Sequence, residues 1–462
     1  MTPLDAIVGG ATSYLADAVL IGGEVVEGVR IEIAPDGRIA ALHHNAGAGD
    51  EHLPGLVLPG LPNLHCHSFQ RAMAGLAERA GPEGDNFWAW REVMYRFLAA
   101  LTPEDVQAIA AQTYVEGLLQ GYTSVAEFHY LHNAADGSAY AEPAELSLRI
   151  AAAAEAAGVG LTLLPVLYRQ GGFGAAPPTE GQRRFVLSFD AYERLCREMA
   201  KYVRIGIAPH SLRAVAPGDL ARAVALADSF GPATPLHIHV AEQTREVDDC
   251  LAWSGARPVA WLLDHAPVDA RWCLVHATHI DEAERARLAA SGAIAGLCQT
   301  TEANLGDGIF PLRPFLAEGG RFGIGTDSNV SASPVEELRW LEYVRRLEGR
   351  ARNVSETRPG ASVAAALLRR AACGGAQALG RPAGEIAVGR MADLIVLDPE
   401  HPTLAGRRGL GLLDAFVFCG NTTPVRHVMV GGTWRVRYGA HVRGREIGSA
   451  FARTMARLAD TL

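Results

Sequence analysis

The chain has 462 residues, of which 49% are apolar and 20% are charged, and its formal net charge at pH 7 is −9. This balance is typical of a globular protein with a large core rather than of a disordered or fibrous chain. An acidic chain does not concentrate the basic side chains that bind phosphate backbones, which excludes nucleic acid as the main partner. No apolar run is long enough to cross a bilayer, so we expect no membrane association.

The cysteines and the N-terminal segment bear on the cellular compartment. The chain has seven cysteines, an odd number, and none of them forms a CxxC pair. Scattered single cysteines suit reduced thiols. The first residues, MTPLDAIVGGATSYLADAVL, lack the basic start of a secretory signal. We therefore expect a cytoplasmic protein.

Residues 56–328 repeat one pattern, in which a short apolar run ends in polar residues and a segment of helical character follows. The eight runs are LVLPGLPNLHCH, YTSVAEFHY, LTLLPVLYR, VRIGIAPHS, PLHIHVAE, WCLVHATH, IAGLCQTTE and FGIGTDS. Runs that are apolar along their length are typical of parallel strands buried on both faces, and their alternation with helices indicates βα units. The pattern predicts an α/β protein with a (β/α)8 barrel of the TIM type over residues 56–383, whose active site lies at the C-terminal ends of the strands.

The two ends of the chain have a different texture, with short alternating runs and turn glycines at residues 17–42 and 384–442. Neither end has enough strands for a stable sheet alone. We therefore expect residues 1–55 and 384–462 to pair into one small β-sandwich beside the barrel, with a helix at the C-terminus.

Three connecting segments carry local signals. In SPVEELRWLEYVRRLEG, Ser333 is placed to cap a helix, Pro334 fits its first position and Glu336 completes a capping box. The connections at residues 68–92 and 169–185 are long for βα loops. They are either lids or plain surface loops.

Two histidines, His65 and His67, end the first run with only Cys66 between them. Side chains alternate along a strand, so the two imidazoles face one side and Cys66 faces the other. Such a pair can offer two nitrogens to one metal ion, although the same spacing also suits two half-buried polar residues. Further ligands decide between these interpretations.

The fifth and sixth runs supply more histidines and a carboxylate. His239 lies nearer the end of its strand and is the expected ligand, whereas His237 is expected to be a deeper core residue with a hydrogen-bond partner. Glu242 follows just past the strand. In the sixth run His276 keeps the strand register and is a candidate for the site, whereas His279 is expected in a solvated loop.

The eighth run ends in Asp327. A lone Asp after a strand is usually a helix cap, but imidazoles from two other strands change this interpretation, because together they form a nitrogen and oxygen site suited to Zn²⁺. Such an ion lowers the pKa of bound water to about 7. Asp327 can accept the proton, while Glu242 and His276 can move protons and stabilise charge. The single lysine, Lys201, precedes the fourth strand at the opposite rim, so we expect one ion per subunit rather than two ions bridged by a carboxylated lysine.

The ordered motifs HCH, HVAE, LVHATH, GTDS and GEIAVGRMADLIVLD resemble the amidohydrolase superfamily, and the resemblance covers nearly the whole chain. Within that superfamily the chain is similar to the formimidoylglutamate deiminases. This similarity rests on LPGLPNLHCHSFQRAMAG, FWAWREVMYRF, YTSVAEFHYLHN, IAPHSLRAV and ELRWLEYVRRL.

The resemblance implies an activity and a set of site residues. The activity is zinc-dependent hydrolysis of N-formimino-L-glutamate to N-formyl-L-glutamate and ammonia, a step of histidine degradation. The implied metal ligands are His65, His67, His239 and Asp327, and Glu242 and His276 would handle the imine. The implied contacts to the substrate carboxylates are Gln70, Arg91, Tyr130, His210 and Arg213, with Arg91 supplied either by the same chain or by the other subunit of a homodimer.

The residue chemistry agrees with a dicarboxylate substrate, because a guanidinium group binds a carboxylate through two parallel hydrogen bonds. Two alternatives stay open. Another deaminase of the superfamily, acting on guanine, cytosine or a modified adenosine, would be expected to show more aromatic stacking surface. A barrel that has lost catalysis and serves as a scaffold is the second, and the intact ligand set speaks against it.

Overall fold

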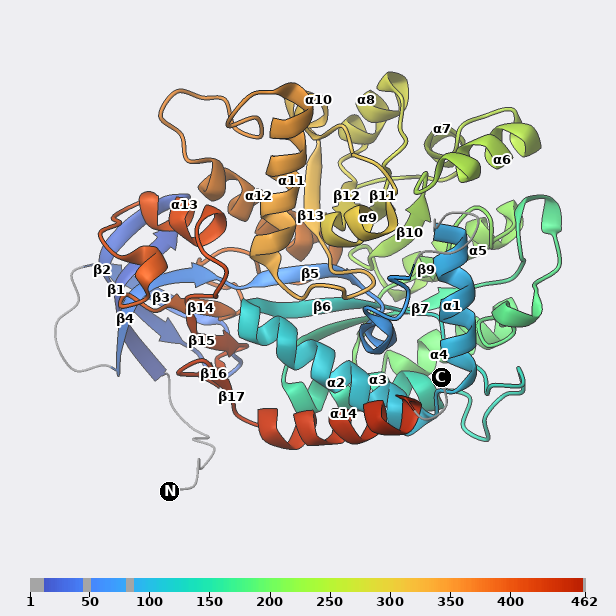
Figure 1. Cartoon of the computed structure of the whole chain (residues 1–462), viewed down its shortest axis with the longest axis horizontal. Helices are drawn as coiled ribbons and strands as arrows, with labels where there is room; N and C mark the ends of the chain where they lie inside the picture. Colours follow the sequence, from blue (N-terminus) through green and yellow to red (C-terminus); the bar gives the residue numbers. More distant parts are fainter. Residues whose placement is uncertain (1–11, 45–50, 80–86, 460–462) are drawn as a thin grey trace.

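The computed structural model describes residues 12–44, 51–79 and 87–459. Two parallel sheets form the centre of the molecule, and a third, mostly antiparallel sheet lies to one side of them (Figure 1). In this third sheet the blue strands from the beginning of the chain lie beside the red strands from its end.

The third sheet, the terminal sheet, has eight strands in the order β17-β16-β15-β14-β4-β1-β2-β3. Its strands are β1 (Thr12–Ile21), β2 (Glu24–Ile33), β3 (Ile39–His44), β4 (Glu51–Pro59), β14 (Leu394–Leu397), β15 (Val425–Val430), β16 (Thr433–Arg437) and β17 (Ala440–His441). The antiparallel pair of β4 and β14 joins its two halves, with Val57 opposite Val396. The two chain ends pair as predicted, because β4 and β14 lie edge to edge in one continuous sheet. Side chains of its two halves also pack on one another, with the ring centroids of Tyr14 on β1 and Trp434 on β16 5.5 Å apart.

The central strands follow one another in chain order. One sheet contains β5 (Leu61–Cys66), β6 (Tyr122–His129), β7 (Gly160–Leu167), β8 (Arg204–Ile205) and β9 (Ala208–Pro209), and the other contains β10 (Leu236–Val240), β11 (Trp272–His276), β12 (Ile294–Leu297) and β13 (Arg321–Ile324). Each of the eight apolar runs of the sequence contributes to these strands. Bridges connect the two sheets at both seams, where Cys66 pairs with Asp327 and Ile207 pairs with Leu236.

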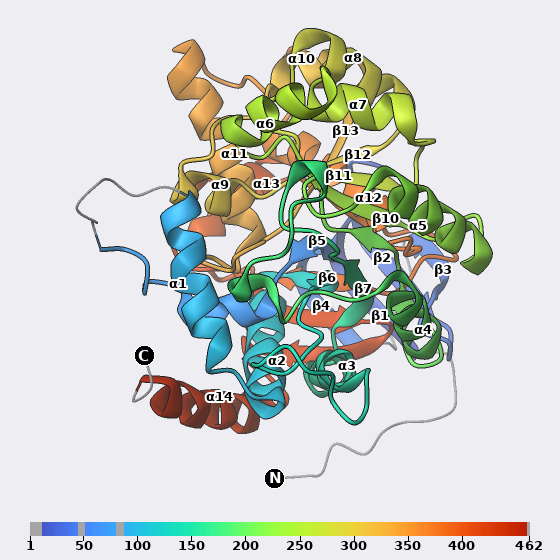
Figure 2. The ribbon, with the colours of Figure 1, turned by 90° about the vertical axis from the view of Figure 1, so that its right-hand side faces the viewer.

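Helices surround the central strands (Figure 2). They are α1 (Phe87–Ala99), α2 (Pro103–Gln120), α3 (Glu145–Ala157), α4 (Phe189–Met199), α5 (Pro217–Phe230), α6 (Thr244–Ser254), α7 (Pro258–His265), α8 (Glu282–Ser291), α9 (Gln299–Leu305), α10 (Leu312–Ala317), α11 (Pro334–Gly349), α12 (Val363–Ala378), α13 (Gly411–Phe418) and α14 (Gly444–Ala459). Short 3-10 helices are η1 (Ser68–Met73), η2 (Phe173–Ala175), η3 (Glu180–Gln182) and η4 (Pro402–Leu404). Among the described residues, no helix combines the length and the apolar character needed to cross a membrane.

Close packing of a helix fixes the strand that carries Asp327. Gly374 of α12 lies directly against β13, because a Cβ atom at this position would be 1.9 Å from the carbonyl oxygen of Phe322. Only a residue without a side chain permits this approach of helix backbone to strand backbone. The end of β13, and the site residue that follows it, are therefore held from outside the sheet.

The predicted cap of α11 is confirmed, since the Ser333 hydroxyl accepts a hydrogen bond from the Glu336 amide at 3.3 Å. The capping box also predicts that the Glu336 carboxylate accepts from the Ser333 amide, and this prediction is wrong. The Glu336 carboxylate accepts from the Ser331 hydroxyl at 2.6 Å, and the Ser333 amide also donates to this hydroxyl. Ser331 thus takes the place that the box assigns to the N-cap backbone.

Two predicted segment limits differ from the structure. β4 runs to Pro59, so the terminal sheet passes the expected boundary at residue 55, and Gly60 alone separates β4 from β5. The connection at residues 68–92 is helical at its end, because α1 begins at Phe87. Residues 80–86 of this connection lie outside the described residues. The connection at residues 169–185 contains the short helices η2 and η3.

Candidate metal centre and active site

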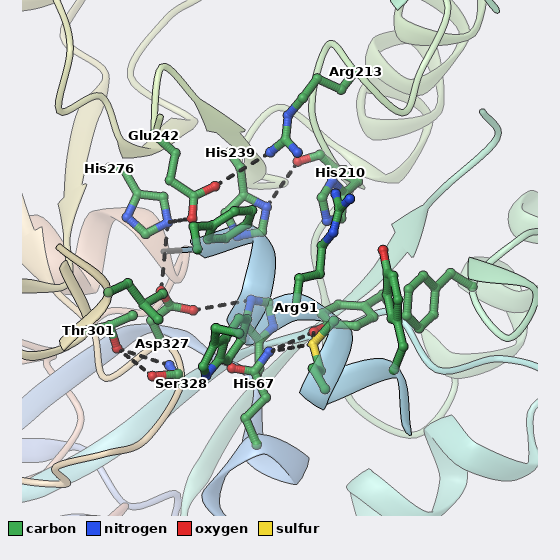
Figure 3. Close-up of a pocket in the computed structure, with 18 of the residues that line it drawn as sticks. His67, Arg91, His210, Arg213, His239, Glu242, His276, Thr301, Asp327 and Ser328 are labelled. Carbon is green, nitrogen blue, oxygen red and sulfur yellow. Dashed lines mark hydrogen bonds and ion pairs between the residues drawn. The ribbon is translucent and has the colours of Figure 1, made fainter. Parts of the chain in front are cut away.

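Three histidine rings from both central sheets meet at the C-terminal ends of the strands. The Nε2 atom of His65 lies 3.2 Å from Nε2 of His67 and 2.9 Å from Nε2 of His239. Asp327 adds a carboxylate, whose Oδ1 lies 3.3 Å from Nε2 of His67 and 3.6 Å from Nε2 of His65. All four side chains are buried, and Figure 3 shows Asp327 directed at His67. The structure therefore brings the four predicted ligands together.

The protonation of these rings fits a bound cation. Nδ1 of His67 lies 2.9 Å from the carbonyl oxygen of Phe128, and Nδ1 of His239 lies 3.1 Å from that of His210. A carbonyl oxygen only accepts, so each Nδ1 carries the proton and each Nε2 presents a lone pair. Burial lowers the pKa of His67 and His239, and it lowers the pKa of His65 to about 3, which keeps the rings neutral. Lone pairs that converge in a buried place suit a metal ion between them.

Backbone conformation turns two of the site residues inward. Asp327 and His276 have φ angles of 48° and 68°, in the left-handed region that side chains rarely adopt. Such a conformation costs on the order of 1–3 kcal/mol per residue and persists where the surrounding structure imposes it. Gly325 contributes to this constraint, because a Cβ atom there would lie 2.8 Å from the carbonyl oxygen of His65. The backbone after β13 thus lies against β5.

His276 lies among three carboxylates. Its Nε2 is 3.8 Å from Oε1 of Glu242 and 3.7 Å from Oδ2 of Asp327, and its Nδ1 is 3.3 Å from Oε1 of Glu302. Burial alone would lower the pKa of His276, but these carboxylates outweigh burial and raise it to about 10. An ionised Glu242 therefore favours a charged His276 ring, which can donate from both nitrogens. Burial raises the pKa of Glu242, which favours a carboxyl group that carries a proton.

The same pocket contains every residue to which the sequence assigned a substrate contact. These residues line it together with the histidines and carboxylates of the site, and they are Gln70, Arg91, Tyr130, His210 and Arg213. Arg213 reaches Oε2 of Glu242 at 3.5 Å (Figure 3). The Gln70 amide donates to the Tyr130 hydroxyl at 2.7 Å, while Oε1 of Gln70 is buried and has no hydrogen-bond partner among the described residues.

Arg91 lies on α1 of the same chain. Its guanidinium group is 4.5 Å from the ring centre of Trp88, and it lines the pocket from within its own subunit. The pKa of His210 is lowered well below its usual range by burial and by the charges of Arg213 and, to a smaller extent, of Arg91. His210 is therefore neutral and has both guanidinium groups in its surroundings.

Some residues of the site were not found from the sequence. Glu302 holds His276, and Glu246 accepts hydrogen bonds from the amides of Ala241 at 3.2 Å and Glu242 at 3.1 Å, which fixes the turn that presents Glu242. Glu302 lies in α9, shortly after β12, and its place at the end of the seventh polar-terminated run was the available signal. Further lining residues are Phe87, Trp90, Met94, Tyr95, Tyr168, Phe185, Thr301, Leu305 and Ser328.

The structure also places the residues that the sequence set apart from the site. His237 is buried and its Nε2 lies 2.8 Å from the carbonyl oxygen of Ala378, which confirms a core histidine with a partner. His279 is not a freely solvated residue, because it is half-buried and donates to the carbonyl oxygen of Asp307 at 2.7 Å. Lys201 is exposed before β8 and pairs with Glu198 at 2.6 Å, away from the ligand cluster.

Comparison with known proteins places these features in a family. Residues 56–435 match the model of the amidohydrolase family. The chain is 53% identical to formimidoylglutamate deiminase of Pseudomonas aeruginosa, over 97% of this chain and 100% of that protein. It is 32% identical to 5-methylthioadenosine/S-adenosylhomocysteine deaminase of Natronomonas pharaonis, over 86% of this chain and 85% of that protein.

Comparison with solved structures gives the same family. An amidohydrolase from Brucella melitensis superposes with a TM-score of 0.91 at 46% identity, covering 97% of this chain and 100% of that one. A zinc-bound adenosine deaminase from Xanthomonas campestris has a TM-score of 0.80 at 22% identity, covering 97% of this chain and 98% of that one, and shares the fold. With its family match, its relatives and its strand-end histidines in agreement, the chain belongs to the amidohydrolase family.

Proposed function

We propose that this protein is a zinc-dependent formimidoylglutamate deiminase, which hydrolyses N-formimino-L-glutamate to N-formyl-L-glutamate and ammonia in histidine degradation. The observation that carries the proposal is the content of one pocket, which combines the hydrolytic groups Asp327, Glu242 and His276 with the guanidinium groups of Arg91 and Arg213. Two guanidinium groups suit a substrate with two carboxylates. The relative that is 53% identical carries the same name.

One Zn²⁺ ion per subunit would be held by His65, His67, His239 and Asp327. When bound, such an ion supplies a water whose pKa is lowered to about 7. The donor set of three neutral imidazoles and one carboxylate agrees with the ligand preferences of zinc. Lys201 is exposed and paired, so it offers no bridge to a second ion.

The proton transfers are assigned to three side chains. Asp327 accepts the proton of the water that attacks the formimino carbon. Glu242, whose raised pKa favours a proton on its carboxyl group, delivers this proton to the imine nitrogen, which becomes the amino group of the tetrahedral adduct. The proton held by Asp327 then passes to the same nitrogen, the C–N bond breaks and ammonia leaves, while the hydroxyl group of the adduct returns a proton to Glu242 as the formyl C=O forms. His276, whose charged form is favoured once Glu242 has given up its proton, donates a hydrogen bond from Nε2 to the tetrahedral centre as charge develops on it.

Substrate recognition is assigned to the other side of the pocket. Arg213 and Arg91 would bind the carboxylates, with Gln70, Tyr130 and His210 as hydrogen-bonding neighbours. Because Arg213 contacts Glu242 in this structure at 3.5 Å, a carboxylate that binds Arg213 would compete for the same guanidinium group. A neutral nucleobase offers no charge to match the two arginines, so a deaminase of nucleobases is not favoured.

Several broader features belong to the same proposal. We take the two central sheets, connected at both seams, as one closed (β/α)8 barrel, with the terminal sheet as an appended domain. We propose a homodimer in the cytoplasm. All seven cysteines are free thiols, which suits a reducing compartment.

The direct test is to load the purified protein with zinc and measure ammonia release from N-formimino-L-glutamate, with guanine and 5-methylthioadenosine as comparison substrates. We expect turnover of the dicarboxylate alone. An Arg213→Met variant should show a KM raised at least tenfold for the dicarboxylate. An Arg222→Met variant, which changes an exposed arginine on α5, is the matched control and should behave as the unaltered protein. Absence of ammonia from the zinc-loaded protein would reject the substrate.

A further inference from the structure

Asp307 is a buried carboxylate that the proposed mechanism does not use. It follows α9 and the left-handed cap at Gly306, and only 4% of its surface is exposed. Its amide donates to the carbonyl oxygen of Glu302 at 2.9 Å. Glu302 is the residue whose carboxylate holds Nδ1 of His276. Asp307 is thus tied to the segment that orients one of the two groups assigned to the imine.

Asp307 also reaches the segment that carries the other group. Its Oδ1 accepts a hydrogen bond from the side-chain amide of Gln243. Gln243 directly follows Glu242 and is the N-cap residue of α6. The carbonyl oxygen of Asp307 accepts from His279, which lies three residues past His276, at 2.7 Å. The loops after β10, β11 and β12 therefore meet at this one residue.

We propose that Asp307 is a positioning residue for Glu242, which it holds in place through Gln243 and which it faces as a second buried carboxyl group. The link between Gln243 and Asp307 fixes the chain immediately after Glu242, where the turn into α6 begins. The two links from the Asp307 main chain fix the same point to the loops of His276 and Glu302. The inference rests on the function proposed for this pocket.

The electrostatic surroundings support the second part of the proposal. The pKa of Asp307 is raised to about 8, mainly by burial. An ionised Glu242 raises it more than Glu302 does, while His276 and the hydrogen bond from Gln243 lower it. The ring of His279 lies against the main chain of Asp307, where it donates to the carbonyl oxygen. The Oδ2 atom is buried and has no hydrogen-bond partner in the described part of the chain, so it has room to carry a proton. A neutral Asp307 leaves Glu242 without a second negative charge nearby.

Two substitutions of Asp307 separate the effect of its hydrogen bond with Gln243 from the effect of its charge. Asp307→Asn keeps an oxygen that accepts from Gln243 but removes the titrating group, whereas Asp307→Ala removes both. We expect kcat of D307A to be roughly tenfold lower at every pH, with KM and zinc content within twofold of the unaltered protein. We expect D307N to match the unaltered protein below about pH 8 and to diverge above it, because only the unaltered protein gains a charge there.

The Gln243→Ala variant tests whether Asp307 acts through Gln243. If it does, Q243A should reproduce the loss of D307A, and the double variant should be no slower than either single variant. Multiplied losses in the double variant would overturn the proposal, as would an unchanged kcat of D307A. A D307N profile that runs parallel to that of the unaltered protein over the whole pH range would overturn it as well.

The same variants have a readout that does not depend on the substrate. The measurement is urea unfolding of the zinc-loaded proteins. The free energy of unfolding lost in the double variant should be smaller than the sum of the losses in D307A and Q243A. If the unaltered protein releases no ammonia from N-formimino-L-glutamate, the proposed function fails, whereas this comparison still tests the link. Additive destabilisation would show that the two side chains act separately and would overturn the inference.

Discussion

His65 and His239 are separated by 174 residues in the sequence and come from different sheets, yet their Nε2 atoms lie 2.9 Å apart. His239 presents a lone pair at Nε2, because its Nδ1 donates to the carbonyl oxygen of His210, and a metal ion between the two rings can accept it. Removing the metal with a chelator should therefore lower the unfolding temperature, and returning zinc should restore it, because a ligand that binds only the folded state stabilises it. The measurement is thermal unfolding with metal analysis. Identical unfolding temperatures before and after metal removal would contradict a bound ion at this place.

Asp327 is expected to act both as a ligand and as an acceptor of the proton from water. Asp327→Asn preserves the shape of the side chain but removes the charge, so we expect kcat to fall by at least about 10²-fold, the lower end of general-base contributions. Zinc content measured beside ammonia release separates the two roles. A variant that retains activity when fully loaded would show that another group takes the proton.

Gly325 permits the contact between the end of β13 and β5. In Gly325→Ala the added methyl group would meet the carbonyl oxygen of His65 at 2.8 Å, so the strand that carries the ligand must shift. We expect weaker zinc binding, measured by competition with a chelator, together with lower stability. Gly218→Ala is the control, because a Cβ atom at that position on α5 meets nothing within 4 Å. Equal zinc affinity in the two variants would show that β5 tolerates the displacement.

His132 is expected to make stability depend on pH. It is buried, its Nε2 lies 2.9 Å from the carbonyl oxygen of Val166, and burial lowers its pKa from 6.5 to about 4. A lowered histidine pKa means that the unfolded chain binds the proton first, so stability present above pH 6.5 is lost as the pH falls towards 4. The contribution is on the order of 3 kcal/mol, from 1.36 kcal/mol per pKa unit.

The corresponding measurement is urea unfolding between pH 7 and pH 4.5 for the unaltered protein and for His132→Gln, which keeps a donor for Val166. The difference between the two proteins isolates His132, because acid affects the metal ligands in both. We expect the variant to lose less stability on acidification. Parallel curves would indicate that His132 titrates alike in the folded and unfolded chain.

Much of the central parallel sheets and of the cluster of predicted metal ligands could be predicted from the sequence, because each depends on a local pattern. The spacing of His65 and His67 puts both rings on one face of a strand, and the end of each apolar run marks the edge where the site forms. Glu302 and Asp307 could not be assigned roles in this way. Their functions depend on hydrogen bonds to His276 and Gln243, residues of other loops that become neighbours only in the folded chain.

The terminal sheet shows a second limit of local patterns. Alternating runs predicted its strands, but the pairing of β4 with β14 joins residues more than 300 positions apart, and nothing in either segment alone indicates which strand it pairs with. Likewise, the aromatic residues before Met94 looked like part of a long loop. Their helix, α1, packs beside the pocket and contributes Arg91 and Trp90 to its wall.

Gly60 is the only residue between β4 and β5, and its amide donates to the carbonyl oxygen of Asp393 in front of β14. A Cβ atom at Gly60 would lie 2.3 Å from the side chain of Thr123, so this junction packs closely against β6. The strand that carries His65 continues almost directly from a strand of the terminal sheet, so a displacement of one strand shifts the other. The terminal sheet thus holds β5 in place, and we expect the two to unfold together in a single cooperative transition.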